Sequence, residues 1–204
     1  MDLYRKWWGG LQAYKGFSII ETEEGNGGQT EATTILLPSE AFNSHNGYEY
    51  LYHQLSYLWN VPIHEEKVLF PRWEEGLAAF CQALTAEKSG DKSPCYAKEQ
   101  ANDNIRRFQE QMVRLPALKE IPFSEYGNRE MTGTSYTYGA MFFATLYYWP
   151  GEETFHKIIG GFYRQCYKSG ASTRTLTAYS IRHGKNERLQ AFSEDWMYTA
   201  NFTR

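Results

Sequence analysis

Three side chains that could bind a metal or move a proton, His53, Tyr57 and Glu75, fall in one stretch of the chain, Tyr48–Cys81. Two helices are predicted across this stretch, and residues four apart in a helix share a face, so His53 and Tyr57 point the same way with Gln54 beside them. Imidazole and carboxylate are ordinary zinc ligands. A phenol with a pKa of about 10 must first lose its proton, and an amide has no basic oxygen. The group resembles a metal site with parts missing.

The spacing is that of the zinc-peptidase motif His-Glu-x-x-His, in which two imidazoles hold the metal and the glutamate is the general base. Here the motif reads His53-Gln54-Leu55-Ser56-Tyr57. Gln54 keeps the shape of the base without its chemistry, and Tyr57 replaces the second imidazole. General acid–base assistance is typically worth ~10²- to 10⁴-fold, so we expect no peptide hydrolysis by that route.

Three further segments resemble the M1 aminopeptidase family. Glu75 followed by Gly76 is similar to the second-helix glutamate that supplies that family's third zinc ligand. The segment Gly28–Ala32 is similar to the Gly-Ala-Met-Glu-Asn signature, and Tyr136–Ala140 is similar to Tyr-x-Lys-Gly-Ala. The matches follow the family's order along the chain.

The resemblance implies an α+β, mostly helical fold: a thermolysin-like gluzincin catalytic domain in which a small sheet packs on a helical bundle. One M1-like domain over residues 1–204 is expected, with a small β-containing lobe at about 1–45 and a helical lobe at about 46–204. M1 enzymes normally carry a β-rich domain ahead of this one, so the chain is also expected to belong to a larger multidomain protein.

The resemblance also assigns roles to seven residues: His53, Glu75 and Tyr57 to a weak or absent metal site, Gln54 to the degenerate general-base position, Tyr136 to an oxyanion-type donor, and Glu31 and Gly28 to substrate binding. In the family, the residue at Glu31 recognises the substrate's amine. No cofactor is expected, and zinc would bind weakly at best. The strand after Glu31 is interpreted as an active-site edge strand that could pair with an extended peptide.

Three functions follow. The preferred one is an inactive M1 peptidase-like domain that keeps a peptide-binding cleft, with a peptide or a protein N-terminus as partner. The first alternative is an active zinc aminopeptidase with an altered metal site made by His53, Tyr57 and Glu75. The second is a structural domain of a larger polypeptide.

The composition excludes some classes of binding partner. The 204 residues have a net charge of −3 with both signs interspersed, which argues against nucleic acid as a partner. No apolar run approaches the roughly 20 residues that cross a bilayer, and the first residues lack the apolar core of a signal peptide. A soluble protein of undetermined compartment is expected. Cys81 and Cys166 lie on apolar stripes and are predicted to be buried thiols.

The hydrophobic pattern indicates the elements that position these residues. It predicts strands at 17–21 and 33–37 around a glycine-rich turn. Helices are predicted at 3–15, from a capping pair at Asn46 and Glu49 to about 60, from Pro71 through a stripe ending at Leu84, and along Ile105–Leu115. Residues 116–134 are predicted to be a long surface segment over the cleft. A buried central helix at 136–149 is followed by helices around 155–166, after a cap at Ser172, and around 189–196.

Overall fold

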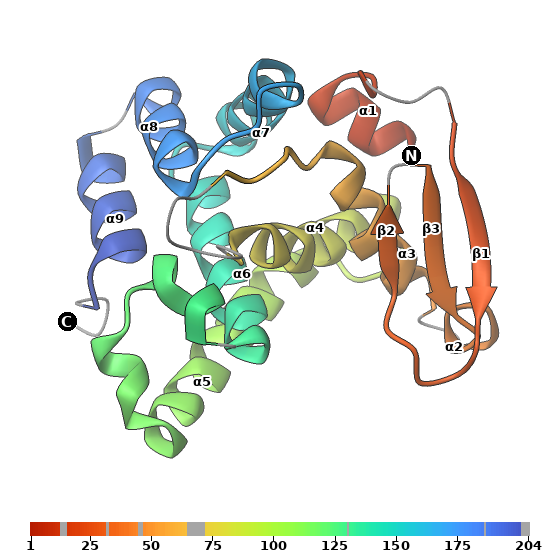
Figure 1. The fold of residues 1–204 in the computed structure, drawn as a ribbon, viewed down its shortest axis with the longest axis horizontal. Helices are drawn as coiled ribbons and strands as arrows, with labels where there is room; N and C mark the ends of the chain where they lie inside the picture. Colours follow the sequence, from red (N-terminus) through yellow and green to blue (C-terminus); the bar gives the residue numbers. More distant parts are fainter. Residues whose placement is uncertain are drawn as a thin grey trace.

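The structure, a computed structural model, describes residues 1–12, 16–31, 33–44, 47–64, 72–129, 131–185 and 187–200. The fold is mostly helical with one small sheet, as the sequence predicted (Figure 1). The elements are α1 (Asp2–Trp8), β1 (Ser18–Thr22), β2 (Gln29–Glu31), β3 (Thr34–Pro38), α2 (Glu40–Asn43), α3 (Tyr48–Ser56), η1 (Tyr57–Trp59), α4 (Trp73–Ser89), α5 (Tyr96–Arg114), η2 (Pro116–Glu120), η3 (Phe123–Arg129), α6 (Thr132–Tyr148), α7 (Glu152–Cys166), α8 (Thr173–Gly184) and α9 (Glu187–Tyr198).

The sheet has the strand order β1-β3-β2, with β1 parallel and β2 antiparallel to β3. The two predicted strands are confirmed as β1 and β3. The third strand, β2, was not predicted, because its sequence Gln-Thr-Glu has no apolar alternation. The interpretation of the strand after Glu31 as a sheet edge is wrong, since β3 is paired on both sides. The sheet's free edges belong to β1 and β2.

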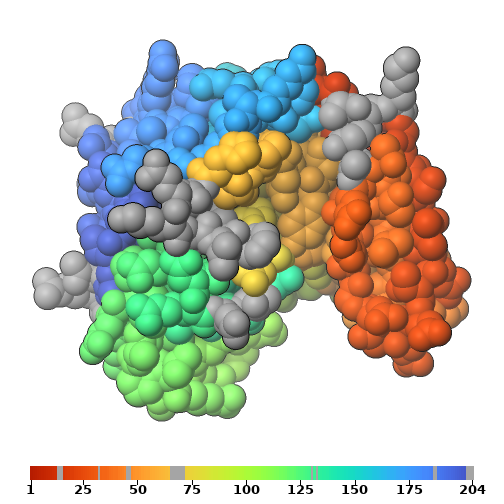
Figure 2. Space-filling view, viewed as in Figure 1, coloured from red at the N-terminus to blue at the C-terminus, as the bar shows by residue number. Residues whose placement is uncertain are grey.

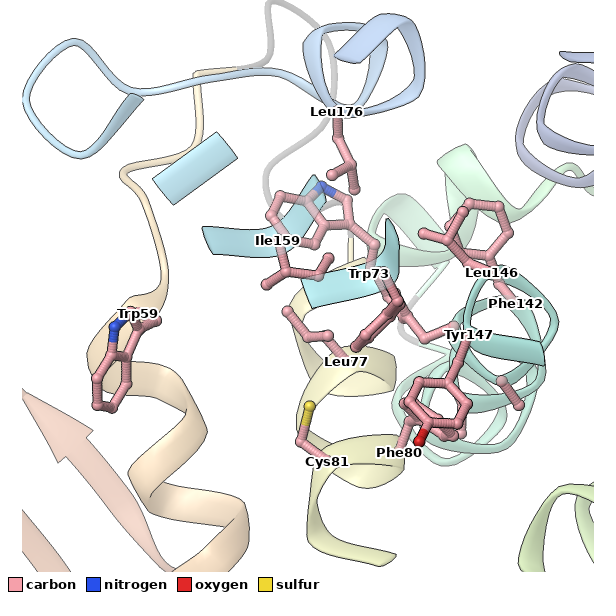
Figure 3. Packing of buried hydrophobic residues seen from close by; sticks show 14 of the residues in the cluster. Trp59, Trp73, Leu77, Phe80, Cys81, Phe142, Leu146, Tyr147, Ile159 and Leu176 are labelled. Atoms are coloured by element: carbon pink, nitrogen blue, oxygen red, sulfur yellow. The ribbon is translucent and has the colours of Figure 1, made fainter. Parts of the chain in front are cut away.

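Helices α4 and α6 form the centre of the helical body. The predicted stripe of α4 is confirmed: Trp73, Leu77, Phe80, Cys81 and Leu84 are all buried. Figure 3 shows residues of this stripe packed against Phe142, Leu146 and Tyr147 of α6 and against Ile159 of α7 and Leu176 of α8. Burial of apolar surface on this scale is the main favourable contribution to folding.

Two glycines allow α4 and α6 to cross at close range. A Cβ built at Gly76 would lie 2.3 Å from the Cα of Gly139, and one built at Gly139 would lie 2.7 Å from the Cα of Gly76. No side chain fits at either position. The crossing brings the preceding turns of the two helices, which carry Glu75 and Tyr136, to one side of the body.

The remaining helices surround this pair. The predicted cap at Ser172 is confirmed as a capping box with Thr175, in which the Ser172 hydroxyl accepts from the Thr175 backbone amide at 3.1 Å. Helix α1 is shorter than the predicted 3–15, because Gly9 ends it with φ +89°. Although α1 precedes the sheet in sequence, it packs on α7, where Arg164 donates to the Trp8 carbonyl at 3.0 Å.

The prediction of a long surface segment at residues 116–134 is only partly confirmed, because the segment has regular turns and three buried side chains. The segment forms η2 and η3, separated by a short bend, and continues into α6. Leu118, Phe123 and Tyr126 are fully buried and hold the segment against the core, whereas its other described residues up to Arg129 are exposed or partly buried. Its spacing does not match an α-helix because 3₁₀ turns repeat every three residues.

Candidate functional site in the cleft

Helix α3 carries the motif residues. It begins after Gly47, which makes no side-chain cap; Asn46 of the predicted capping pair lies outside the described residues. The motif face of α3 is buried rather than open to solvent. His53 is 8% exposed and Gln54 5% exposed, because α4 and the β2 strand pack on either side of them.

His53, Tyr57 and Glu75 meet as the sequence predicted. The His53 Nε2 atom lies 3.0 Å from the Tyr57 hydroxyl and 4.0 Å from the Glu75 carboxylate. The Tyr57 hydroxyl donates a very short hydrogen bond to Glu75. Arg72 Nη1 lies 3.7 Å from the other Glu75 oxygen and partly balances its charge.

The hydrogen-bond directions define the protonation of this group. A phenol has one proton, which Tyr57 gives to Glu75, so His53 Nε2 must carry a proton to reach the Tyr57 oxygen. Burial, then the negative charge and hydrogen bond of Glu75, raise the pKa of Tyr57 far above its usual value near 10. Burial lowers the pKa of His53, against a smaller opposing effect of Glu75. A neutral imidazole and a neutral phenol therefore face one carboxylate.

This arrangement does not fit a zinc ion. Zinc takes deprotonated donors, so a phenol can hold it only as a phenolate. Burial and the negative charge of Glu75 instead keep Tyr57 protonated, and its hydroxyl is hydrogen-bonded to Glu75. Among the described residues, no group of three or more histidines, cysteines and acidic residues could hold a metal.

Gln54, at the general-base position, is held by the sheet. The Thr30 hydroxyl lies 2.8 Å from the Gln54 side-chain oxygen and 3.0 Å from its backbone carbonyl. A Cβ at Gly28 would lie 2.7 Å from the Gln54 side-chain nitrogen, so Gly28 is in close contact with this amide. Gln54 thus connects α3 to β2 and to the loop before it.

A pocket of about 510 Å³ opens beside this group, between the sheet and the helical body. Its lining residues are Gly27, Gly28, Glu49, Tyr50, His53, Gln54, Gln82 and Tyr136. The Tyr136 ring stacks on the His53 ring with centroids 5.7 Å apart. Burial, followed by Glu75, raises the pKa of Tyr136 well above its usual value, so it remains a hydroxyl donor. Figure 2 shows the surface hollowed between the strands and the helices.

Glu31 is placed differently from the other predicted site residues. It is exposed at the end of β2, and its carboxylate accepts a hydrogen bond from Gln29 at 2.7 Å. It is not among the described residues that line the pocket. A ligand that reached both His53 and Glu31 would have to extend along β2.

Four pocket residues were missed by the sequence reasoning: Gly27, Glu49, Tyr50 and Gln82. Glu49 accepts a hydrogen bond from Gln82 at 3.1 Å and forms an ion pair with Lys92 at 3.1 Å. Its position four residues before His53 places it on the same helix face, a signal that could have found it. Gln82 follows Glu75 by seven residues, two turns along the same face of α4.

Comparison with known proteins supports the fold. No protein-family model matches the sequence, and no curated protein sequence matches it. The structure is similar to the crystal structure of an M1 zinc metallopeptidase from Deinococcus radiodurans, with a TM-score of 0.71 and 17% sequence identity. The match covers 95% of this chain and 41% of that one. The chain therefore has an M1 peptidase-like fold and spans less than half the length of that protein.

Within the described residues, none of the helices is long and apolar enough to cross a membrane.

Proposed function

We propose that this chain is an M1 peptidase-like domain that binds peptides in its cleft and does not hydrolyse them. One observation carries the proposal: the Tyr57 hydroxyl lies between His53 and Glu75 and is hydrogen-bonded to both. A protein of the same fold is named as a zinc metallopeptidase. In this chain, the hydrogen bond from the Tyr57 hydroxyl to Glu75 connects the groups that would otherwise have to hold the ion.

The chemistry of hydrolysis is absent from the residues at this position. The Gln54 amide cannot accept a proton from water, and its oxygen already accepts from Thr30. An altered metal site would need Tyr57 as a phenolate, which the burial of Tyr57 and the charge of Glu75 both oppose. Together these features disfavour the alternative of an active aminopeptidase.

The groups suited to binding remain accessible. The pocket offers the Tyr136 hydroxyl, the Gln82 amide and the Glu49 carboxylate beside the His53 ring. Strand β2 is a sheet edge, so an extended peptide could add to it by backbone hydrogen bonds. We propose that the peptide N-terminus lies toward Glu31 and that Gly28 lets the backbone approach. That the chain is one part of a larger polypeptide stays a prediction.

Zinc titration tests the absence of a metal catalyst. We expect no stoichiometric zinc by calorimetry and no hydrolysis of aminoacyl arylamides after zinc loading. If zinc binding or hydrolysis is detected, Glu75→Ala is the matched variant that tests whether it comes from this site. Stoichiometric zinc with turnover that Glu75→Ala abolishes would establish the aminopeptidase and end the proposal.

A double variant tests whether the backbone still presents a metal site. Gln54→Glu with Tyr57→His restores His-Glu-x-x-His, and with Glu75 it supplies the ligand set of a zinc peptidase. We expect it to bind zinc at least a hundred times more tightly than the single variant Gln54→Glu. A folded double variant without metal would show that the site is lost for reasons beyond Tyr57.

Peptide binding is tested with peptides that carry free or acetylated N-termini. We expect measurable binding by fluorescence anisotropy that weakens on acetylation and in Glu31→Gln. Glu24→Gln, which removes an exposed charge from the turn before β2, is the control and should leave binding unchanged. If no peptide binds, the binding part of the proposal fails. If free and acetylated forms bind alike, the assignment of Glu31 fails.

A further inference from the structure

Helix α5 carries an apolar stripe that the fold leaves uncovered. Ile105, Phe108, Met112 and Leu115 have helical spacing, yet only Phe108 is fully buried. Ile105 is 44% exposed. Facing it across a gap is the end of α6, where Trp149, just past the helix, is 54% exposed. Exposed apolar side chains on both sides of one gap indicate a binding surface.

The gap is a cavity of about 740 Å³ that lies between α5 on one side and α6 and α9 on the other. It is separate from the cleft beside His53, with which it shares no lining residue. The lining residues are Lys98, Ala101, Asn102, Ile105, Phe108, Gln109, Met112, Tyr138, Met141, Ala144, Thr145, Tyr148, Trp149 and Trp196. The volume is that of small-molecule pockets, which run from about 300 to 1,000 Å³, and is too small for a partner helix.

The polar groups of the lining indicate the charge of the ligand. Lys98 is its only charged residue, and Lys98 forms no ion pair with any residue that the structure describes. Asn102, one turn further along α5, adds an amide. An apolar trough with a single cation at its rim complements a molecule with an apolar body and one anionic group. A neutral apolar ligand has no charged group that could pair with the Lys98 ammonium, and a cationic ligand would be repelled by it.

We propose that this trough binds an amphiphilic carboxylate, such as a medium- or long-chain fatty acid. The hydrocarbon chain of the fatty acid lies between Ile105 and Trp149, and its carboxylate lies against Lys98. Met112 and Met141 on opposite walls suit a flexible chain, because unbranched thioether side chains adapt to irregular shapes. The site does not depend on peptide binding in the cleft.

The test compares laurate with dodecanol, which has the same chain and no charge, by isothermal titration calorimetry on the full chain. We expect laurate to bind with one-to-one stoichiometry and more tightly than dodecanol. Lys98→Gln should weaken laurate binding by about two- to five-fold, which is the contribution of one partly solvated ion pair. It should leave the affinity for dodecanol unchanged. Lys168→Gln, an exposed lysine outside the trough, is the matched charge control and should change neither.

A second variant tests the location. Ala101 lines the trough from α5, and Ala101→Phe should fill it and remove laurate binding while the melting temperature stays close to that of the unmodified chain. The proposal is overturned if neither ligand binds, if Lys98→Gln weakens both ligands equally, or if folded Ala101→Phe still binds laurate. Concentration-dependent dimerisation that laurate does not disperse would assign the surface to a second copy and overturn it as well.

Discussion

Gly76 of α4 and Gly139 of α6 are in direct backbone contact at the point where the two central helices cross. In α4, Gly76 directly follows the cleft residue Glu75. In α6, Gly139 lies three residues after the cleft residue Tyr136. Because neither glycine has a side chain, the two helices approach closely here, and this approach sets the distance between Glu75 and Tyr136.

Gly139→Ala tests this contact. The added methyl would lie 2.7 Å from the Gly76 Cα and 3.0 Å from the Phe123 ring, so the helices must separate. Overpacking of this kind typically costs about 1–3 kcal/mol, and we expect about 3 kcal/mol of lost stability in urea denaturation. Gly133→Ala, in the first turn of α6 with open space around it, is the control and should be neutral or slightly stabilising. Equal effects at the two glycines would contradict the role of the crossing.

Tyr57→Phe tests the hydroxyl bridge between α3 and α4. The change leaves His53 and Glu75 without the group that joins them, and an unsatisfied buried polar group costs about 1–3 kcal/mol. We expect a loss of stability in that range by chemical denaturation. Tyr50→Phe, at an exposed tyrosine on the same helix, should have no measurable effect. A fully stable Tyr57→Phe would mean that water or Arg72 replaces the hydroxyl without cost.

His156 predicts a loss of stability in acid. Its ring stacks on Trp7 with centroids 4.6 Å apart, Glu152 lies 3.8 Å away, and burial lowers its pKa to about 4. Because the pKa is near 6.5 in the unfolded chain, protonation favours unfolding: the stabilisation is complete above pH 6.5 and is lost as the pH falls toward 4.

The expected loss from His156 between pH 7 and pH 4.5 is about 2–3 kcal/mol, measured as the difference between the unmodified chain and His156→Phe in urea denaturation at both pH values. The difference is needed because Glu74, whose pKa burial raises to about 7, acts in the opposite direction and destabilises the fold as the pH rises. An identical pH dependence in the two proteins would show that His156 is free to charge in the folded state.

Strand β1 predicts self-association through the sheet edge. Ile19 and Ile20 are 43% and 48% exposed on an edge strand, an arrangement that templates pairing with other chains. Ile20→Lys should reduce aggregation in light scattering while changing the free energy of unfolding by less than about 0.5 kcal/mol. Val113→Lys, at an exposed valine on α5, serves as the control for added charge. Equal protection by both variants would argue for a net-charge effect.

Much of the fold followed from local patterns. The period of the apolar residues predicted the central helices, and the hydroxyl of Ser172 predicted a cap, because both effects act within a few residues along the chain. The residue types alone also indicated that Gln54 cannot act as a base. These conclusions needed no knowledge of which segments meet.

Contacts between distant segments decided the rest. Strand β2 forms because residues 29–31 pair with β3, and this pairing places β3 in the middle of the sheet instead of at its edge. The 3₁₀ turns after Pro116 and the uncovered stripe of α5 depend on which neighbours α6 and α9 provide. The sequence placed His53, Tyr57 and Glu75 on facing helices, but only the tertiary structure decided that the Tyr57 hydroxyl is hydrogen-bonded between the other two. A hydrogen bond between side chains depends on burial and on distances of tenths of an ångström, which residue spacing does not encode.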